Sequence, residues 1–202
     1  MNGKTLVALR QRSLSILLQL ALFLSFFAVV TVSAQRAHAQ ASSQYTSQEV
    51  VDAGHNFFGK TSGALAGALE QVFSTYGLPN GYILGEDLGG AFIGGLRYGE
   101  GMLYTKNAGD HKVYWQGPSV GWDYGVDGNR TMMLVYNLPD IPSLYRRYFG
   151  VSGSAYVIGG VGVTALANHD VVLVPVRTGI GARVGVNVGY LKLTQIPTAN
   201  PF

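Results

Sequence analysis

Apolar residues recur every three or four positions between residues 46 and 78, and this spacing predicts two short amphipathic helices. Thr46 and Glu49 stand three residues apart at the start of the first helix, as in a capping box. The second helix is expected to end at Gly77, because glycine is favoured just after a helix and Pro79 prevents continuation. Each helix therefore needs a surface on which to bury its apolar face.

After Pro79 the apolar period changes to about two, which is typical of β-strands. The pattern predicts about eight to ten short strands, with an irregular crossing and one helical turn at residues 139–149. The expected strands cover residues 82–84, 91–98, 101–105, 112–116, 120–124, 131–137, 154–166, 171–177 and 183–193. Turns are expected at residues 107–110, at Asp127-Gly128 and at residues 168–170. Helices do not alternate with these strands, which argues against a doubly wound α/β fold.

Glycine occurs throughout the strand region, and in that setting it lets a strand coil tightly or approach another backbone. We therefore predict a mainly β (α+β) fold, in which two N-terminal helices pack on a small soluble antiparallel β-barrel. Residues 46–196 are expected to form one domain, with a helical hairpin at 46–78, the barrel at 79–196 and a tail at 197–202.

The first 39 residues have the pattern of an export signal, with a basic start, an apolar run from Leu14 to Val32 and small residues after it. Cleavage is predicted after Ala39, with Ala34 as the alternative site, and a polar leader at residues 40–45 follows. A retained membrane anchor is the competing interpretation, since about 18 apolar residues can span a bilayer. The sequence thus predicts a periplasmic protein.

Removal of residues 1–39 changes the charge of the chain. Four of the 14 Lys and Arg residues lie in that segment, which leaves 10 basic against 11 acidic residues. Because the remaining basic residues are scattered, we expect no nucleic-acid partner. The chain has no cysteine, so it has no disulfide and no thiolate chemistry.

Gly117-Pro118-Ser119-Val120-Gly121 matches the G-x-S-x-G pattern of serine hydrolases, and Asp140 and His169 follow in the required order. That pattern needs a strand, a sharp turn and a helix, whereas strand-like residues follow Ser119 here. A hydrolase acting on envelope substrates through Ser119 is therefore kept only as a second alternative. Gly179 to Gly185 resembles a dinucleotide fingerprint with one residue too many, so no cofactor is expected.

Three acidic residues, Glu86, Asp87 and Glu100, flank the expected strand at 91–98, which also contains Arg97. A pair of carboxyl groups at the right separation can hydrolyse a glycoside. Ion pairing at the strand ends is the simpler interpretation. His55, His111 and His169 are each alone in sequence, so the spacing predicts no metal site.

One local cluster combines aromatic and basic residues. It comprises Leu144, Tyr145, Arg146, Arg147, Tyr148 and Phe149. It is a candidate for contact with lipid or a membrane surface. The competing interpretation is that this segment caps one end of the barrel, with its arginines in solvent.

The stretches Gly89 to Leu138 and Gly153 to Thr194, together with Phe57-Phe58-Gly59, resemble the envelope integrity protein A family of alphaproteobacteria. This resemblance implies a periplasmic protein that supports the cell envelope, with a small soluble β-barrel related in shape to the SYLF lipid-binding domain. It supplies no catalytic residues. The expected function is non-enzymatic support of envelope integrity, with lipid or another envelope component as the candidate partner. The alternative is a scaffold that docks a periplasmic or membrane partner.

Overall fold

The computed structural model describes residues 43–59, 63–88, 96–118, 129–178, 189–200 and 202. The export segment with both cleavage sites, Ser119, the Asp127-Gly128 turn and the glycines of residues 179–185 lie outside these ranges. Within the described ranges, no helix is both long enough and apolar enough to cross a bilayer.

The two predicted helices are present as α2 (Ser47–Phe58) and α3 (Gly63–Tyr76). The capping box is confirmed: the Thr46 hydroxyl accepts a hydrogen bond from the Glu49 N–H at 3.3 Å, and the Thr46 N–H donates to Glu49 Oε2 at 2.6 Å. Gly77 has a φ of +76°, and its N–H donates to the Phe73 carbonyl at 2.9 Å. Only glycine adopts this left-handed conformation readily, so Gly77 ends α3 as predicted.

Eight of the described strands close into an antiparallel barrel, which confirms the predicted fold class. The ring runs β4-β1-β2-β3-β10-β5-β8-β9 and closes by pairing of β9 with β4. Two further strands, β6 and β7, extend from the free part of the β9 edge. The bounds are β1 (Gly81–Leu88), β2 (Leu96–Thr105), β3 (Gly109–Pro118), β4 (Asn129–Tyr136), β5 (Arg147–Gly150), β6 (Tyr156–Ile158), β7 (Val161–Val163), β8 (Leu166–Asn168), β9 (Val171–Thr178) and β10 (Tyr190–Thr194).

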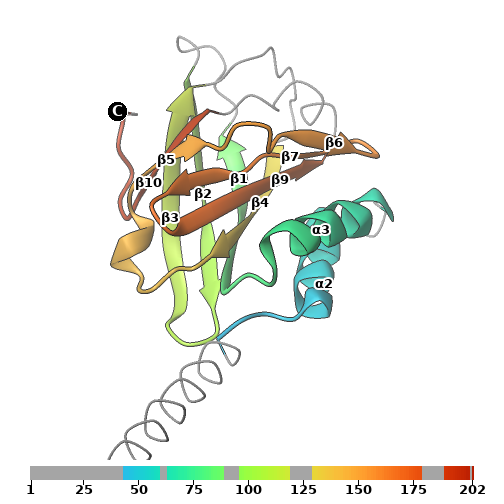
Figure 1. Cartoon of the computed structure of the whole chain (residues 1–202). Helices are drawn as coiled ribbons and strands as arrows, with labels where there is room; N and C mark the ends of the chain where they lie inside the picture. The colour runs from blue at the N-terminus through green and yellow to red at the C-terminus, as the bar shows by residue number, and fades with distance from the viewer. Residues whose placement is uncertain (1–42, 60–62, 89–95, 119–128, 179–188, 201) are drawn as a thin grey trace, which may run out of the picture. The chain divides into compact units, whose positions relative to one another are not determined.

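The helices lie on one side of the barrel, over β4 and β9 and the β6–β7 hairpin (Figure 1). On β4, Met133 and Val135 point into the barrel, whereas Met132 and Leu134 point outward into the helix-facing core. All residues from Thr131 to Tyr136 are consequently buried. The protein thus has two apolar cores, one inside the barrel and one between the barrel and the helices.

The barrel interior is filled with side chains rather than hollow along its described length. Trp115 is its largest member and is fully buried. Its indole lies against Gly85 and Gly99: a Cβ at Gly99 would lie 2.1 Å from Trp115 Cε2, and one at Gly85 would lie 2.6 Å from Cη2. The interior core comprises Ile83, Leu103, Val113, Trp115, Met133, Val135, Leu144, Tyr148, Leu166, Val171, Leu173, Leu191 and Leu193.

Three predictions of strand extent were wrong. Residues 139–149 were expected as an irregular crossing with one helical turn; the turn is present at residues 142–144, but β5 begins at Arg147, because it pairs with β10 and β8. Residues 91–98 and 101–105 were expected as separate strands, but β2 runs without a break from Leu96 to Thr105, because Gly99 and Gly101 stay in the strand. Residues 154–166 were expected as one strand. They form β6, a turn, β7 and the start of β8, because Gly159 and Gly160 adopt φ values of +55° and +84° and reverse the chain.

Candidate functional site

A cluster of charged side chains lies inside the barrel at one end. Asp87 is near the end of β1, Arg97 near the start of β2 and Arg177 near the end of β9. The strands are antiparallel, so these positions meet at the same end, and strand alternation points all three inward. We call Asp87, Arg97, Trp115, Thr131 and Arg177 the buried arginine cluster.

Asp87 is the centre of this cluster and is 8% exposed. Its Oδ1 accepts a hydrogen bond from Trp115 Nε1 at 2.6 Å, and its Oδ2 accepts one from Thr131 Oγ1 at 3.1 Å. Arg177 Nη2 lies 3.2 Å from Oδ2, and Arg97 Nη1 lies 3.8 Å from the same atom. Both carboxylate oxygens are therefore occupied by donors or cations.

Two arginine side chains, Arg97 and Arg177, surround the single carboxylate of Asp87, so the cluster has more positive than negative groups. Arg97 is 8% exposed, and the side chain of Arg177 is 14% exposed. Within the described part of the chain, Nε, Nη1 and Nη2 of Arg97 and Nε and Nη2 of Arg177 have no hydrogen-bond partner. Buried donors are ordinarily satisfied, so an unpartnered guanidinium at this depth needs an explanation.

The other acidic residues near Arg97 form ordinary surface pairs. Glu86 and Glu100 stand opposite each other in the β1–β2 register and are exposed. Lys112 Nζ lies 3.3 Å from Glu100 Oε1, and Arg130 Nε lies 3.7 Å from Glu86 Oε1. The predicted ion pairing is confirmed for these carboxylates, but Glu100 lies in the middle of β2 rather than at a strand end. Asp87 is the acidic residue of the set that turns inward.

The segment from Leu144 to Phe149 does not present a single surface. Leu144, in a short 3₁₀ turn (η1, Pro142–Leu144), and Tyr148 are fully buried in the interior core, and Tyr145 packs against that core. The Tyr148 hydroxyl donates to the Leu144 carbonyl at 3.0 Å, and burial raises the pKa of this phenol. Arg146, Arg147 and Phe149 are exposed. The segment thus closes the barrel with some side chains and offers the others to solvent.

The exposed part of this segment continues onto the neighbouring strand. In the β5–β10 register, Arg147 stands opposite Lys192, and Phe149 stands opposite Tyr190. The Phe149 and Tyr190 rings meet edge to face with centroids 5.5 Å apart. We call Arg147, Phe149, Tyr190 and Lys192 the basic–aromatic face. Arg147 forms no ion pair with another described residue, whereas Lys192 Nζ donates to the main-chain oxygens of Asn200 at 3.0 Å and of Phe202 at 2.9 Å.

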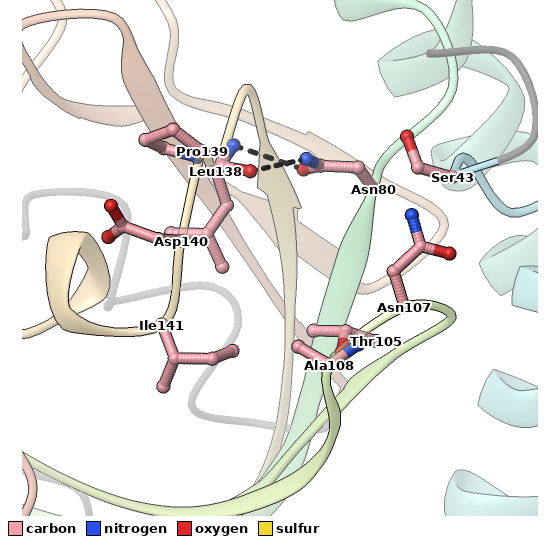
Figure 2. A pocket seen from close by; sticks show the side chains of 9 residues that line it. All are labelled: Ser43, Asn80, Thr105, Asn107, Ala108, Leu138, Pro139, Asp140 and Ile141. Carbon is pink, nitrogen blue, oxygen red and sulfur yellow. Dashed lines mark hydrogen bonds between the residues drawn. The ribbon is translucent and has the colours of Figure 1, made fainter. Parts of the chain in front are cut away.

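A shallow depression of about 160 Å³ lies where residues 138–141 pass the β2–β3 turn (Figure 2). Asn80 links its two sides: its Nδ2 donates to the Leu138 carbonyl at 2.8 Å, and its Oδ1 accepts from the Leu138 N–H at 3.2 Å. Asp140 lies on the rim, and hydrogen bonds from Ser143 lower the pKa of its carboxyl. These contacts fix the loop at residues 138–141.

Two of the described histidines contact their own turns, and His55 lies in α2. His111 Nε2 lies 2.8 Å from the Ala108 carbonyl, and His169 Nδ1 lies 2.7 Å from Asn168 Oδ1. Among the described residues, no group of three or more His, Cys, Asp or Glu side chains could hold a metal ion. Ser119 lies outside the described residues, and the contacts described for Asp140 and His169 are with Ser143 and Asn168 respectively.

The chain matches a known protein family over most of its length. The family model described as envelope integrity protein A matches residues 43–202. The chain belongs to the envelope integrity protein A family. This confirms the predicted resemblance, and membership implies a role in the integrity of the cell envelope.

A crystal structure of a beta-barrel-like, uncharacterized protein from Brucella abortus matches this member of the envelope integrity protein A family at 67% sequence identity. The match covers 80% of this chain and all of that chain, with a TM-score of 0.76. No protein with a curated description matches the sequence.

The buried arginine cluster is not evident from the sequence pattern alone. Arg97 and Asp87 were interpreted as strand-end ion pairs, and Arg177, Trp115 and Thr131 were not singled out. A signal was present, because Ile83, Gly85 and Asp87 share one face of a strand, as do Arg97, Gly99 and Leu103. A charged residue in register with an apolar face points to the interior.

Proposed function

We propose that this chain is a non-enzymatic periplasmic protein that supports envelope integrity through contact with lipid. Membership of the envelope integrity protein A family supports the envelope role. The basic start, the apolar run and the small residues before Ala39 support export to the periplasm.

The side chains that fill the barrel interior limit where the acyl chains of a lipid can bind. An acyl chain inside a barrel needs a cavity, and the described interior is occupied by Trp115 and its apolar neighbours. Displacing such buried side chains would cost several kcal/mol. The acyl chains of a lipid are therefore contacted on the outside of the barrel.

The basic–aromatic face is the observation that carries this proposal. Phe149 is 55% exposed beside Tyr190, and Arg147 and Lys192 flank the two rings. Aromatic rings favour the boundary between headgroups and acyl chains, and cations favour anionic headgroups. Each basic side chain near an anionic surface contributes about 1 kcal/mol, so two give weak, reversible binding that salt opposes.

Vesicle flotation tests this proposal. The purified protein is expected to float with vesicles that contain anionic phospholipid, to float less as salt rises, and to stay behind with purely zwitterionic vesicles. Arg147→Gln/Lys192→Gln is expected to lower the bound fraction at low salt by about tenfold or more, from the loss of about 2 kcal/mol. Phe149→Ser weakens binding in the same direction.

The control carries the same charge change elsewhere. Lys106→Gln/Arg130→Gln removes two exposed cations that contact α2, through Glu49 and the Phe57 carbonyl. This variant should bind vesicles as the unmodified protein does. If both double variants lost vesicle binding to the same extent, the loss would reflect the net charge of the protein rather than the basic–aromatic face, and this would contradict the proposal. Ester hydrolysis that disappears in Ser119→Ala would contradict the non-enzymatic part.

The scaffold alternative has one specific observation in its favour. Strand β6 pairs with β7 alone and ends the sheet order, so it offers an open edge among the described strands. Val157 in this strand is 42% exposed. A partner that adds a strand would bind here. A photocrosslinker at residue 157 that captures one defined envelope protein in cells would favour this alternative over lipid contact.

A further inference from the structure

The buried arginine cluster carries more positive charge than the protein neutralises. Two guanidinium groups and one carboxylate leave a net charge of +1 in a nearly dry environment. The carboxylate is already engaged by Trp115 and Thr131. A buried charge without a partner is costly, and replacing such groups by apolar residues is often neutral or stabilising. Stability alone therefore does not account for two arginines here.

The two guanidinium groups of the cluster lie close together. Arg97 Nη1 and Arg177 Nη2 both approach Asp87 Oδ2, at 3.8 and 3.2 Å, so they are no farther apart than the sum of these distances, 7.0 Å. Five guanidinium nitrogens of these two residues have no hydrogen-bond partner in the described part of the chain. Arg97, more than nine-tenths buried, has none on any of its three nitrogens.

Guanidinium groups are the side chains best suited to bind oxyanions, because their planar N–H pairs match two oxygens at once. A carboxylate presents two oxygens, whereas a phosphate group presents three or more strong acceptors. Of the five nitrogens without a hydrogen bond, Arg97 Nη1 and Arg177 Nη2 face Asp87. Arg97 Nε and Nη2 and Arg177 Nε remain for the larger acceptor set. Asp87 pairs with both arginines, and Trp115 and Thr131 donate hydrogen bonds to Asp87.

We propose that the buried arginine cluster is a binding site for a phosphate group, either free inorganic phosphate or the phosphate of a lipid headgroup. Arg97 and Arg177 bind the phosphate oxygens, and Asp87 positions both guanidinium groups. This site is distinct from the basic–aromatic face, and binding of inorganic phosphate requires no membrane.

Phosphate titration of the purified protein tests the site. The protein is expressed from the whole coding sequence in a Trp122→Phe background, which leaves Trp115 as the single tryptophan. Phosphate replaces chloride at constant ionic strength. A saturable change in Trp115 fluorescence, a rise in unfolding temperature and a shift in the phosphorus NMR line are expected.

Arg97→Met is expected to weaken phosphate binding by at least about tenfold, since it removes one charge-assisted pair. Its unfolding temperature in phosphate-free buffer is expected not to fall, because the Arg97 side chain makes no hydrogen bond in the described structure and Arg177 still pairs with Asp87. Arg130→Met removes an exposed arginine outside the cluster and should bind as the unmodified protein does. The Arg147→Gln/Lys192→Gln variant should also bind phosphate normally, which separates this site from the vesicle contact.

A short-chain phosphatidic acid, used below its micelle concentration, distinguishes the two sources. Displacement of phosphate by this lipid at lower concentration identifies a headgroup site, and its failure to compete identifies a site for free phosphate. Either outcome upholds the proposal. A protein without a saturable phosphate response overturns it, as does an Arg97→Met variant that binds within about twofold of the unmodified protein. The phosphorus NMR measurement on the unmodified protein decides the matter even if Arg97→Met fails to fold.

Discussion

Trp115 shows how single residues determine what this barrel can contain. The indole occupies the space that side chains at residues 85 and 99 would otherwise take, and its N–H holds Asp87. The glycines of β1 and β2 are thus needed for the volume they leave free, rather than for an unusual backbone conformation. One aromatic side chain connects the apolar core to the charged end.

Gly99→Ala is expected to destabilise the protein by about 3 kcal/mol or more, at the upper end for overpacking, because the new methyl group meets a buried ring. Denaturant unfolding measures this change. Gly67→Ala is the matched control: it lies within α3, where an added Cβ meets nothing within 4 Å. It should be neutral or stabilising by about 0.5–1 kcal/mol. Equal effects of the two substitutions would contradict this account of Trp115.

The burial of Arg97 could not be predicted from the sequence with the same ease as the burial of leucines. Arginine at a strand end is ordinarily exposed, and the other members of the buried arginine cluster come from β1, β3, β4 and β9. Only the closed ring shows that these strands converge. For the basic–aromatic face, sequence pointed to Arg147 and Phe149, but Tyr190 and Lys192 join them through long-range pairing.

At the scale of elements, signals that act within a few residues were predictable. The start of α2 at Thr46 and the end of α3 at Gly77 depend on hydrogen bonds between residues three or four apart. The extent of β2 depends instead on partners in β1 and β3. Gly99 and Gly101 indicate a break when only the sequence is considered, and the neighbouring strands hold them in register.

The α2 capping box predicts a pH dependence. The hydrogen bond from the Thr46 backbone, with help from Lys106, lowers the pKa of Glu49 from 4.5 to about 2. Between these values the unfolded chain binds more protons than the folded one, so the stability that Glu49 contributes is present above pH 4.5 and lost towards pH 2.

Glu49→Gln removes this titration and can still accept the capping hydrogen bond. The stability difference between the unmodified protein and Glu49→Gln, measured by denaturant unfolding, should therefore shrink as pH falls through this window. Glu70→Gln, at an exposed position of α3, is the control and should show no such convergence. A difference that stays constant with pH would refute the argument.

At the scale of the whole molecule, β4 and β9 join the two cores. Their inward side chains belong to the barrel interior, and their outward side chains to the layer beneath α2 and α3. Loss of either layer exposes apolar surface on the same two strands. Residues 43–202 form one compact unit, and we expect helices and barrel to unfold together.

Leu69→Ala tests this coupling from the helix side. Leu69 is fully buried between α3 and the barrel, so the cavity should cost about 2–5 kcal/mol. Far-UV circular dichroism follows the helices, and fluorescence of the Trp122→Phe protein follows Trp115 inside the barrel. Both transitions should move to lower denaturant by the same amount. Earlier loss of the helical signal, with the Trp115 transition unmoved, would show that the layers are independent.

The double burial of β4 has a consequence before the protein folds. Residues 131–136, Thr-Met-Met-Leu-Val-Tyr, carry no charge, no proline and no glycine. Such a hexapeptide is prone to self-association into cross-β aggregates when it is accessible. A newly synthesised chain cannot hide it until β1, β9 and the helices have all assembled. Arg130, the residue just before this segment, supplies one charge that opposes stacking of these strands. Until the barrel closes, unfolded chains must be kept from associating with one another through this segment.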